Sequence, residues 1–198
     1  MAKVVKFPVP EPVKFGLQKA QKRKQNEPEV HGQLNLFQGG RVVKLGQLST
    51  FEEALLLDEQ GDRLNSKNLY LKAIEEGEAL ADANCNLGIM ESVEGNHTRA
   101  IDYFTRALKE DPRHSESHYN LANLYAEVGN YNLAKVHYTI AIELEPNYPN
   151  SYFNLGLTLA VTKEFTAAVE ALRKFTKLSP GDDHKQVNQL IEQLTSLL

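Results

Sequence analysis

Residues 115–148 read SESHYNLANLYAEVGNYNLAKVHYTIAIELEPNY and contain two apolar stripes at helical spacing. The first stripe is formed by Leu121, Leu124 and Tyr125. The second stripe is formed by Leu133, Ala134, His137, Tyr138, Ala141 and Ile142. Gly129-Asn130 separates the stripes and is typical of a turn, and Pro146 ends the second helix because it cannot continue the helical hydrogen bonds. The stretch therefore predicts a helical hairpin.

The same pattern recurs on both sides of this stretch with a period of 34 residues, in 81–114 and in 149–182. Each segment has a leucine followed by a small residue, then an alanine, a large apolar residue and a closing proline. In chain order these landmarks are Leu87, Gly88, Ala100, Phe104 and Pro112; Leu121, Ala122, Ala134, Tyr138 and Pro146; and Leu155, Gly156, Ala168, Leu172 and Pro180. Small residues allow two helices to cross closely, so we expect the small residue and the alanine of each segment to face each other. A fixed period of this length predicts stacked helical hairpins.

These landmarks resemble the tetratricopeptide repeat family. The resemblance implies an all-α, right-handed α-solenoid of about four hairpins, in which the first helix of each hairpin lines a concave face. It also implies that the chain holds other proteins. The sequence departs from the family pattern at Glu91, where an aromatic residue is usual, and at Phe175, which replaces the second alanine of the repeat.

Two further elements complete the predicted solenoid of residues 47–182. Residues 47–80 form a degenerate unit, which we expect to cap the N-terminal end because terminal repeats need a more polar outer face. Its matching residues are Ala54, Gly61, Tyr70 and Ala73. Residues 183–198 predict a C-terminal capping helix, whose apolar stripe consists of Val187, Leu190, Ile191, Leu194, Leu197 and Leu198. The alternative for this stripe is a free amphipathic helix that seeks a membrane or a partner.

The first 46 residues differ in composition from the rest of the chain. They contain nine Lys and Arg residues against three acids and four of the eight prolines, whereas the remainder has 13 basic residues against 23 acids. We therefore predict that residues 1–46 form a disordered, basic, proline-containing arm or linker. One alternative is that the arm folds back, with Val4–Pro10 in the groove of its own chain.

The resemblance also indicates where a ligand would bind. The sixth position of each repeat lines the concave face, and here it is Asn86, Asn120 and Asn154. A side-chain amide can hydrogen-bond the backbone of an extended peptide without reading its side chains. Apolar anchors are expected from Tyr119, Phe153, Ile89 and Leu157, with Asn123 among them. Two alternatives are that the asparagines bind only water, and that the C-terminal helix partly covers Phe153, Leu157 and Val161.

The charges of the predicted groove exclude one class of partner. Some members of the family grip the acidic tails of heat-shock chaperones with lysines and arginines on the concave positions. In this sequence those positions hold Asp82, Cys85, Glu116, Asn150 and Asn154. Like charges would oppose an acidic tail, so we expect a protein or peptide partner of another kind, with apolar anchors and a basic flank.

A short motif before the repeats suggests a second function. Gln33-Leu34-Asn35-Leu36-Phe37 resembles the segment by which bacterial replication and repair proteins dock on the sliding clamp. In that role Leu36 and Phe37 would insert into an apolar pocket and Gln33 would make polar contacts. The alternative is that Leu34, Leu36 and Phe37 pack in extended form against the first repeat.

The remaining features favour neither catalysis nor a cofactor. His114 and His118 have the spacing of a two-ligand metal site on a helix, but a third ligand is not evident. Cys85 would be a nucleophile only if a histidine and an acid converge on it. We therefore predict no catalytic residue, no metal and no cofactor. The acidic repeat body also argues against nucleic acid.

The sequence gives an expectation for the compartment but none for the oligomeric state. No stretch is long and apolar enough to span a membrane, and the N-terminus lacks the apolar run of a secretory signal. The single cysteine, Cys85, excludes an internal disulfide and fits a reducing compartment. The sequence therefore predicts a cytoplasmic protein.

Overall fold

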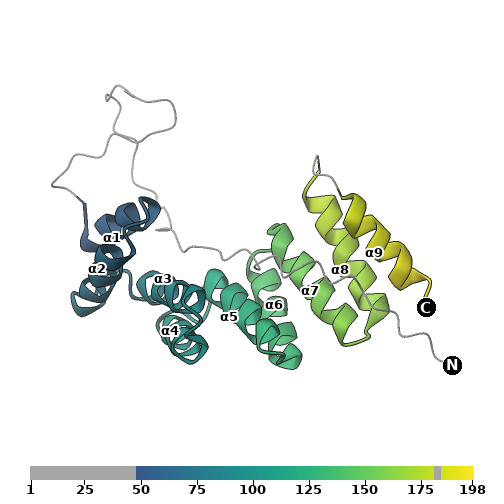
Figure 1. Ribbon diagram of the computed structural model, residues 1–198, viewed down its shortest axis with the longest axis horizontal. Coiled ribbons are helices and arrows are strands. Elements are labelled where there is room, and N and C mark those ends of the chain that lie inside the picture. Colours follow the sequence, from purple (N-terminus) through teal and green to yellow (C-terminus); the bar gives the residue numbers. More distant parts are fainter. Residues whose placement is uncertain (1–47, 181–183) are drawn as a thin grey trace, which may run out of the picture. The chain divides into compact units, whose positions relative to one another are not determined.

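The computed structural model describes residues 48–180 and 184–198, and these residues form nine α-helices and no strand (Figure 1). The helices are α1 (Thr50–Glu59), α2 (Arg63–Glu75), α3 (Leu80–Val93), α4 (His97–Glu110), α5 (Ser115–Glu127), α6 (Tyr131–Leu144), α7 (Pro149–Val161), α8 (Phe165–Leu178) and α9 (Lys185–Thr195). Successive pairs from α1 to α8 form hairpins, and α9 follows. The predicted all-α class with about four hairpins is confirmed. The predicted arm of residues 1–46 lies outside the described residues.

All four hairpins turn through a residue with a left-handed backbone. The φ angle is +83° at Gly61, +78° at Gly95, +79° at Gly129 and +64° at Lys163. Glycine adopts this region without a steric penalty, which explains the predicted turn at Gly129. Lys163 has a Cβ atom, so the same conformation costs this residue roughly 1 kcal/mol.

The described residues divide into two compact units, of which the N-terminal unit ends at Ser117. The buried core of its first three helices consists of Phe51, Ala54, Tyr70, Ala73, Ala83, Leu87 and Met90. The degenerate first hairpin closes with polar contacts. Glu78 Oε2 accepts a hydrogen bond of 3.0 Å from the Phe51 N–H, and Thr50 Oγ1 donates to Glu76 Oε2 at 2.6 Å. Glu78 thus satisfies a backbone donor in the first turn of α1.

Glycine at the helix crossings is required by the residue that lies over it. A Cβ atom on Gly88 would stand 2.7 Å from Phe104 Cε1, and one on Gly156 would stand 2.8 Å from Leu172 Cγ. The nearest group is therefore the large apolar landmark of the second helix rather than the expected alanine. Beside Gly156, the carbonyl oxygen of Ala168 follows at 3.4 Å.

The C-terminal unit begins at His118 and contains two buried clusters. The cluster of α5 and α6 consists of Tyr119, Ala122, Ala126, Ala134, Tyr138 and Ala141. The cluster of α7, α8 and α9 consists of Leu159, Ala168, Val169, Ala171, Leu172, Ile191 and Leu194. Leu155 packs against both clusters and joins them. The C-terminal helix thus buries Ile191 and Leu194 on the last hairpin. Among the described helices, none has the length and apolar content of a membrane span.

Candidate functional site

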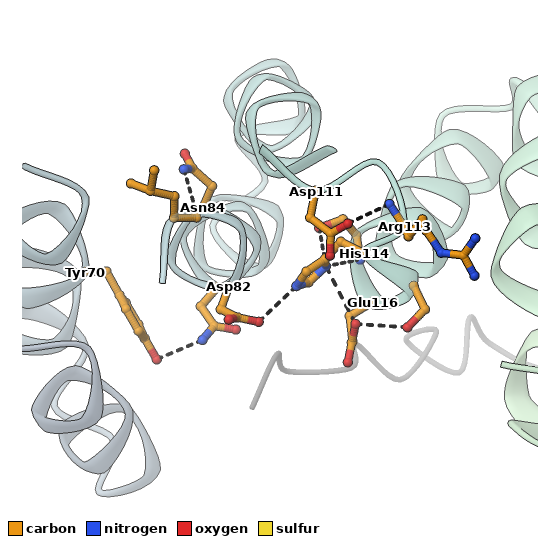
Figure 2. A network of polar contacts seen from close by, with 11 residues as sticks. Tyr70, Asp82, Asn84, Asp111, Arg113, His114 and Glu116 are labelled. Carbon is orange, nitrogen blue, oxygen red and sulfur yellow. Dashed lines mark hydrogen bonds and ion pairs between the residues drawn. The ribbon is translucent and has the colours of Figure 1, made fainter. Parts of the chain in front are cut away.

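In the N-terminal unit, polar side chains of α3 contact Tyr70 of α2 and His114, the residue directly before α5 (Figure 2). Asn86, one of the predicted groove residues, is buried, and its Nδ2 donates to the Tyr70 hydroxyl of α2 at 3.2 Å. Asp82 Oδ1 lies 3.0 Å from His114 Nε2 at the start of α5. These contacts connect α3 to the helix before it and to the first turn of α5. Ile89, the apolar anchor predicted on α3, is also buried.

His114 acts as the cap of α5. It directly precedes Ser115, the first residue of the helix, and its Nδ1 accepts a hydrogen bond of 3.1 Å from the Ser117 N–H. Ser117 Oγ lies 2.9 Å from the same nitrogen, and Nε2 faces Asp82. An acceptor from the capping residue satisfies a helix N–H that has no partner within the helix. The imidazole ring therefore fixes the start of α5 relative to α3.

The protonation of His114 is set by opposing effects. Burial lowers the pKa of the ring, but Asp82, Cys85 and Glu116 raise it, and the net direction is upward. The capping hydrogen bond acts against a raised pKa, because His114 Nδ1 can accept from the Ser117 N–H only while this nitrogen carries no proton.

Cys85 would be a nucleophile only if a histidine and an acid converged on its thiol, and the surroundings of His114 test this condition. A histidine and an acid do lie beside Cys85, but Cys85 is fully buried. His114 Nδ1 already accepts from the Ser117 N–H, and Nε2 already faces Asp82. The His114 ring also hydrogen-bonds the Cys85 side chain, and the burial of Cys85 keeps this thiol away from any substrate, so the arrangement fits a structural role.

Glu91 stands where the repeat family usually has an aromatic residue, and its buried carboxylate is paired with Lys67. The Glu91 side chain is 3% exposed, and its Oε1 lies 2.7 Å from Lys67 Nζ of α2. Asn96 Nδ2 donates to Oε2 at 2.9 Å. The hydrogen bond from Lys67 holds the pKa of Glu91 below its ordinary value, although burial acts in the opposite direction. A buried ion pair therefore stands where the family usually has an aromatic ring.

In the C-terminal unit, two of the predicted asparagines meet in one buried polar cluster between α5, α6 and α7. Asn154 Nδ2 donates to the Tyr119 hydroxyl at 3.1 Å and to Asn123 Oδ1 at 2.9 Å. The Tyr138 hydroxyl donates to the same Asn123 oxygen at 2.6 Å. Burial raises the pKa of Tyr119 and of Tyr138, so both hydroxyls stay neutral. We call Tyr119, Asn123, Tyr138 and Asn154 the amide cluster.

The other predicted groove residues lie in different surroundings. Asn120 is fully buried, and Leu157 is partly buried. Phe153 is partly buried and packs against the α7–α9 core, with its ring centroid 5.0 Å from that of Phe175. Val161 is exposed. Phe153 thus contributes to the C-terminal core.

A histidine pair connects α5 and α6. The Nδ1 atoms of His118 and His137 are 2.9 Å apart, and the ring centroids are 5.2 Å apart. Two imidazole rings whose Nδ1 atoms are this close have their largest centroid separation when each Nδ1 lies on the line between the centroids. The observed separation is close to that limit, so the two Nδ1 atoms point at each other. One ring must donate a hydrogen bond through its Nδ1–H, and the Nδ1 of the other ring must accept it. Burial and then the neighbouring His118 lower the pKa of His137 to about 4.

His114 and His118, which have the spacing of a two-ligand site on a helix, do not face each other. His114 faces Asp82, whereas His118 faces His137. Within residues 48–180 and 184–198, no three His, Cys, Asp or Glu side chains gather as a metal site requires. The predicted clamp motif Gln33–Phe37, with Leu34 and Leu36, lies outside the described residues.

Sequence reasoning missed the partners of the asparagines. The repeat pattern identifies Tyr70 and Tyr138 as large apolar residues and does not show that their hydroxyls bond asparagines. The sequence shows His114 only by its spacing from His118, not as the cap of α5. Periodicity places a residue on a face of its helix, but it does not identify the group opposite. A signal was present in one case, because a polar residue directly before an N-terminal helical turn is typical of a cap.

Models of the tetratricopeptide repeat match residues 51–115, 115–148 and 149–182. No curated protein matches the chain.

Several solved structures share the fold. MamA protein is 21% identical with a TM-score of 0.64, covering 75% of this chain and 81% of its own. YrrB, described as a TPR protein with an unusual peptide-binding site, is 20% identical with a TM-score of 0.59, covering 72% and 73%. The first TPR of Spaghetti (RPAP3), bound to the HSP90 peptide SRMEEVD, is 18% identical with a TM-score of 0.55, covering 60% and 92%. At these identities the likeness shows the fold. Since the family matches together span residues 51–182, the chain belongs to the tetratricopeptide repeat family.

Proposed function

We propose that this chain is a protein-interaction module without catalytic activity, an adaptor or scaffold that binds an extended peptide or a helix of a partner protein. The binding residues lie on the first helices of the hairpins, which are α3 in the N-terminal unit and α5 and α7 in the C-terminal unit. The observation that carries the proposal is the asparagine at the sixth position of each of these helices, flanked by aromatic and aliphatic residues. Membership of a family of helical repeats supports an interaction role.

Two of the structural relatives concern peptides. One is bound to an HSP90 peptide, and another is described as having an unusual peptide-binding site. In the present chain Asp82 and Glu116 stand where a basic clamp would be needed, and Asp82 already faces His114. We therefore infer a partner without an acidic tail, and we expect the two to meet in the cytoplasm.

The alternative function is an adaptor of DNA replication or repair that reaches the sliding clamp through Gln33–Phe37. It uses a segment separate from the repeats, so the two functions make different demands on the chain. Clamp docking requires Gln33, Leu36 and Phe37, and it should survive substitutions on α5 and α7. Binding of the chain to purified clamp, with and without Phe37→Ala, distinguishes this alternative.

The binding face can be tested with a photo-crosslinking amino acid at single positions. Leu157, partly buried on α7, is the test position, and Val136, 53% exposed on α6, is the matched control on a second helix. After irradiation in a lysate of the source organism, Leu157 should crosslink to a defined segment of one partner, and Val136 should not. A synthetic peptide of that segment should then bind the unmodified chain. If the segment crosslinks through Val136 alone, the proposed face is wrong.

A further inference from the structure

Helix α6 exposes apolar side chains on one face. Leu133 is 40% exposed and Val136 is 53% exposed, and Ile140, partly buried, continues the row. Residues i, i+3 and i+7 of an α-helix lie on one side of it, so the three side chains form a stripe. The side of the helix that packs against α5 is a different one, and its buried residues are Ala134, Tyr138 and Ala141. We call Leu133, Val136 and Ile140 the α6 stripe.

The equivalent positions of the other second helices are mostly charged or polar. The residues one repeat earlier are Arg99, Asp102 and Arg106 of α4, and those one repeat later are Ala167, Glu170 and Lys174 of α8. On α4, Arg106 and Asp102 form a surface ion pair of 2.7 Å. The α6 stripe is therefore an apolar exception in a row of solvated positions. Apolar side chains that are exposed together usually mark an interaction site.

The charges beside the α6 stripe favour a second copy of the chain as its partner. Asn132 and Thr139, the exposed residues next to the stripe, are neutral, and Lys135 forms an ion pair with Glu164. A second copy brings the same charges as the first, so it can approach only a face on which like charges do not meet. The α6 stripe meets this condition, whereas the equivalent face of α4 carries two arginines.

The α6 stripe fits its own copy in an antiparallel orientation. With a two-fold axis next to Val136, Leu133 of one copy packs beside Ile140 of the other, and the two Val136 side chains lie together. Glu143, exposed near the end of α6, then lies beside the first turn of the second copy's helix. That end of a helix carries a partial positive charge, and the first turn of α6 contains no acidic residue. A parallel pair would instead bring the two Glu143 carboxylates together.

From this complementarity we propose that the α6 stripe is a self-association surface, through which two copies of this chain pair by antiparallel contact of their α6 helices. The inference is independent of the peptide-binding face proposed above, because that face uses the first helices of the hairpins. The α6 stripe consists of three side chains and is small for a protein interface. The dimer should therefore be weak and should form as the protein concentration rises.

The first test is sedimentation of the full chain at concentrations from about 10 µM to about 500 µM. The wild type should change from the mass of a monomer to that of a dimer. Val136→Lys should weaken the association at least about tenfold, because two like charges would meet at the axis. Asn68→Lys, the same charge at the equivalent exposed position of α2, should leave the association unchanged, and circular dichroism checks that both variants are folded.

The second test uses the symmetry of the proposed pair. Val136→Lys and Val136→Glu should each be monomeric, and a mixture of the two variants should associate at low salt, because opposite charges then meet at the axis. A photo-crosslinking amino acid at residue 136 should also give an adduct with twice the mass of the chain.

Four results would overturn the inference. The wild type could stay monomeric at about 500 µM, or its dimer could persist in Val136→Lys, which would place the contact on another face. The mixture of the two charged variants could stay monomeric, which would exclude a pair with residue 136 at its axis. An adduct from residue 136 with a different protein, and none with the chain itself, would mean that the α6 stripe binds a partner of another kind.

Discussion

Acid should destabilise the C-terminal unit through the histidine pair of α5 and α6. The pKa of His137 is lowered from 6.5 to about 4 in the folded chain, with burial as the main cause and His118 as the second. The unfolded chain takes up the proton near pH 6.5, whereas the folded chain resists it until about pH 4. Stability is therefore fully present above pH 6.5, and it is lost as the pH falls from 6.5 towards 4.

The size of this loss follows from the difference between the two pKa values. Each pKa unit corresponds to about 1.4 kcal/mol, so the complete loss is at most roughly 3 kcal/mol, and roughly 2.5 kcal/mol should be gone at pH 4.5. The geometry gives the reason. The facing Nδ1 atoms, 2.9 Å apart, share one proton, and a second proton on this line would break the contact between α5 and α6.

The assay is urea unfolding followed by circular dichroism at several pH values between 7.5 and 4.5. Carboxylates also titrate in this range, so the informative quantity is the difference between wild type and His137→Gln. The variant should lose less stability than wild type by an amount approaching 2.5 kcal/mol. His97→Gln, at the start of α4 in the N-terminal unit, controls for the loss of one histidine. Parallel curves for wild type and His137→Gln would refute the reasoning.

Three other substitutions or ligands test separate features. Lys163→Gly should raise stability by roughly 1 kcal/mol, because it relieves the left-handed strain at φ +64°; a lower melting temperature would contradict this. Lys67→Met should lower the free energy of unfolding by about 1–3 kcal/mol, since Glu91 keeps a buried charge while Lys67 is itself 27% exposed; unchanged urea unfolding would show that the pair is screened. The peptide SRMEEVD should give no saturable change in fluorescence anisotropy up to about 1 mM, and tight binding would show that the basic clamp is dispensable.

The positions of the helices could be predicted because the same landmark residues recur in each repeat at a fixed spacing. The turn at Gly129 has equivalents at Gly61 and Gly95, and the backbone at each requires a positive φ. The small residue, the alanine and the large apolar residue of each repeat are buried for a shared geometric reason, as the close approach of Phe104 to Gly88 shows. A pattern that recurs at a fixed period carries this information in the sequence alone.

The partners of the polar side chains could not be predicted in the same way. His114 and His118 are four residues apart, but His114 lies just before α5 and caps it, so the two rings do not share a helical face. Glu91 departs from the repeat pattern, and only the structure shows Lys67 opposite it. Asn123 accepts hydrogen bonds from Tyr138 of α6 and Asn154 of α7, and the periodicity of α5 identifies neither partner.

The position of Leu155 between the two clusters of the C-terminal unit has a consequence for how this unit unfolds. Leu155 packs against both cores, and Asn154 beside it bonds to two side chains of α5. Neither hairpin can open without exposing an apolar side chain and breaking hydrogen bonds that belong to the other. The hairpins of α5–α6 and α7–α8 should therefore melt in a single cooperative step, with shared protection of their amides against hydrogen exchange, while opening from the chain end begins at α9.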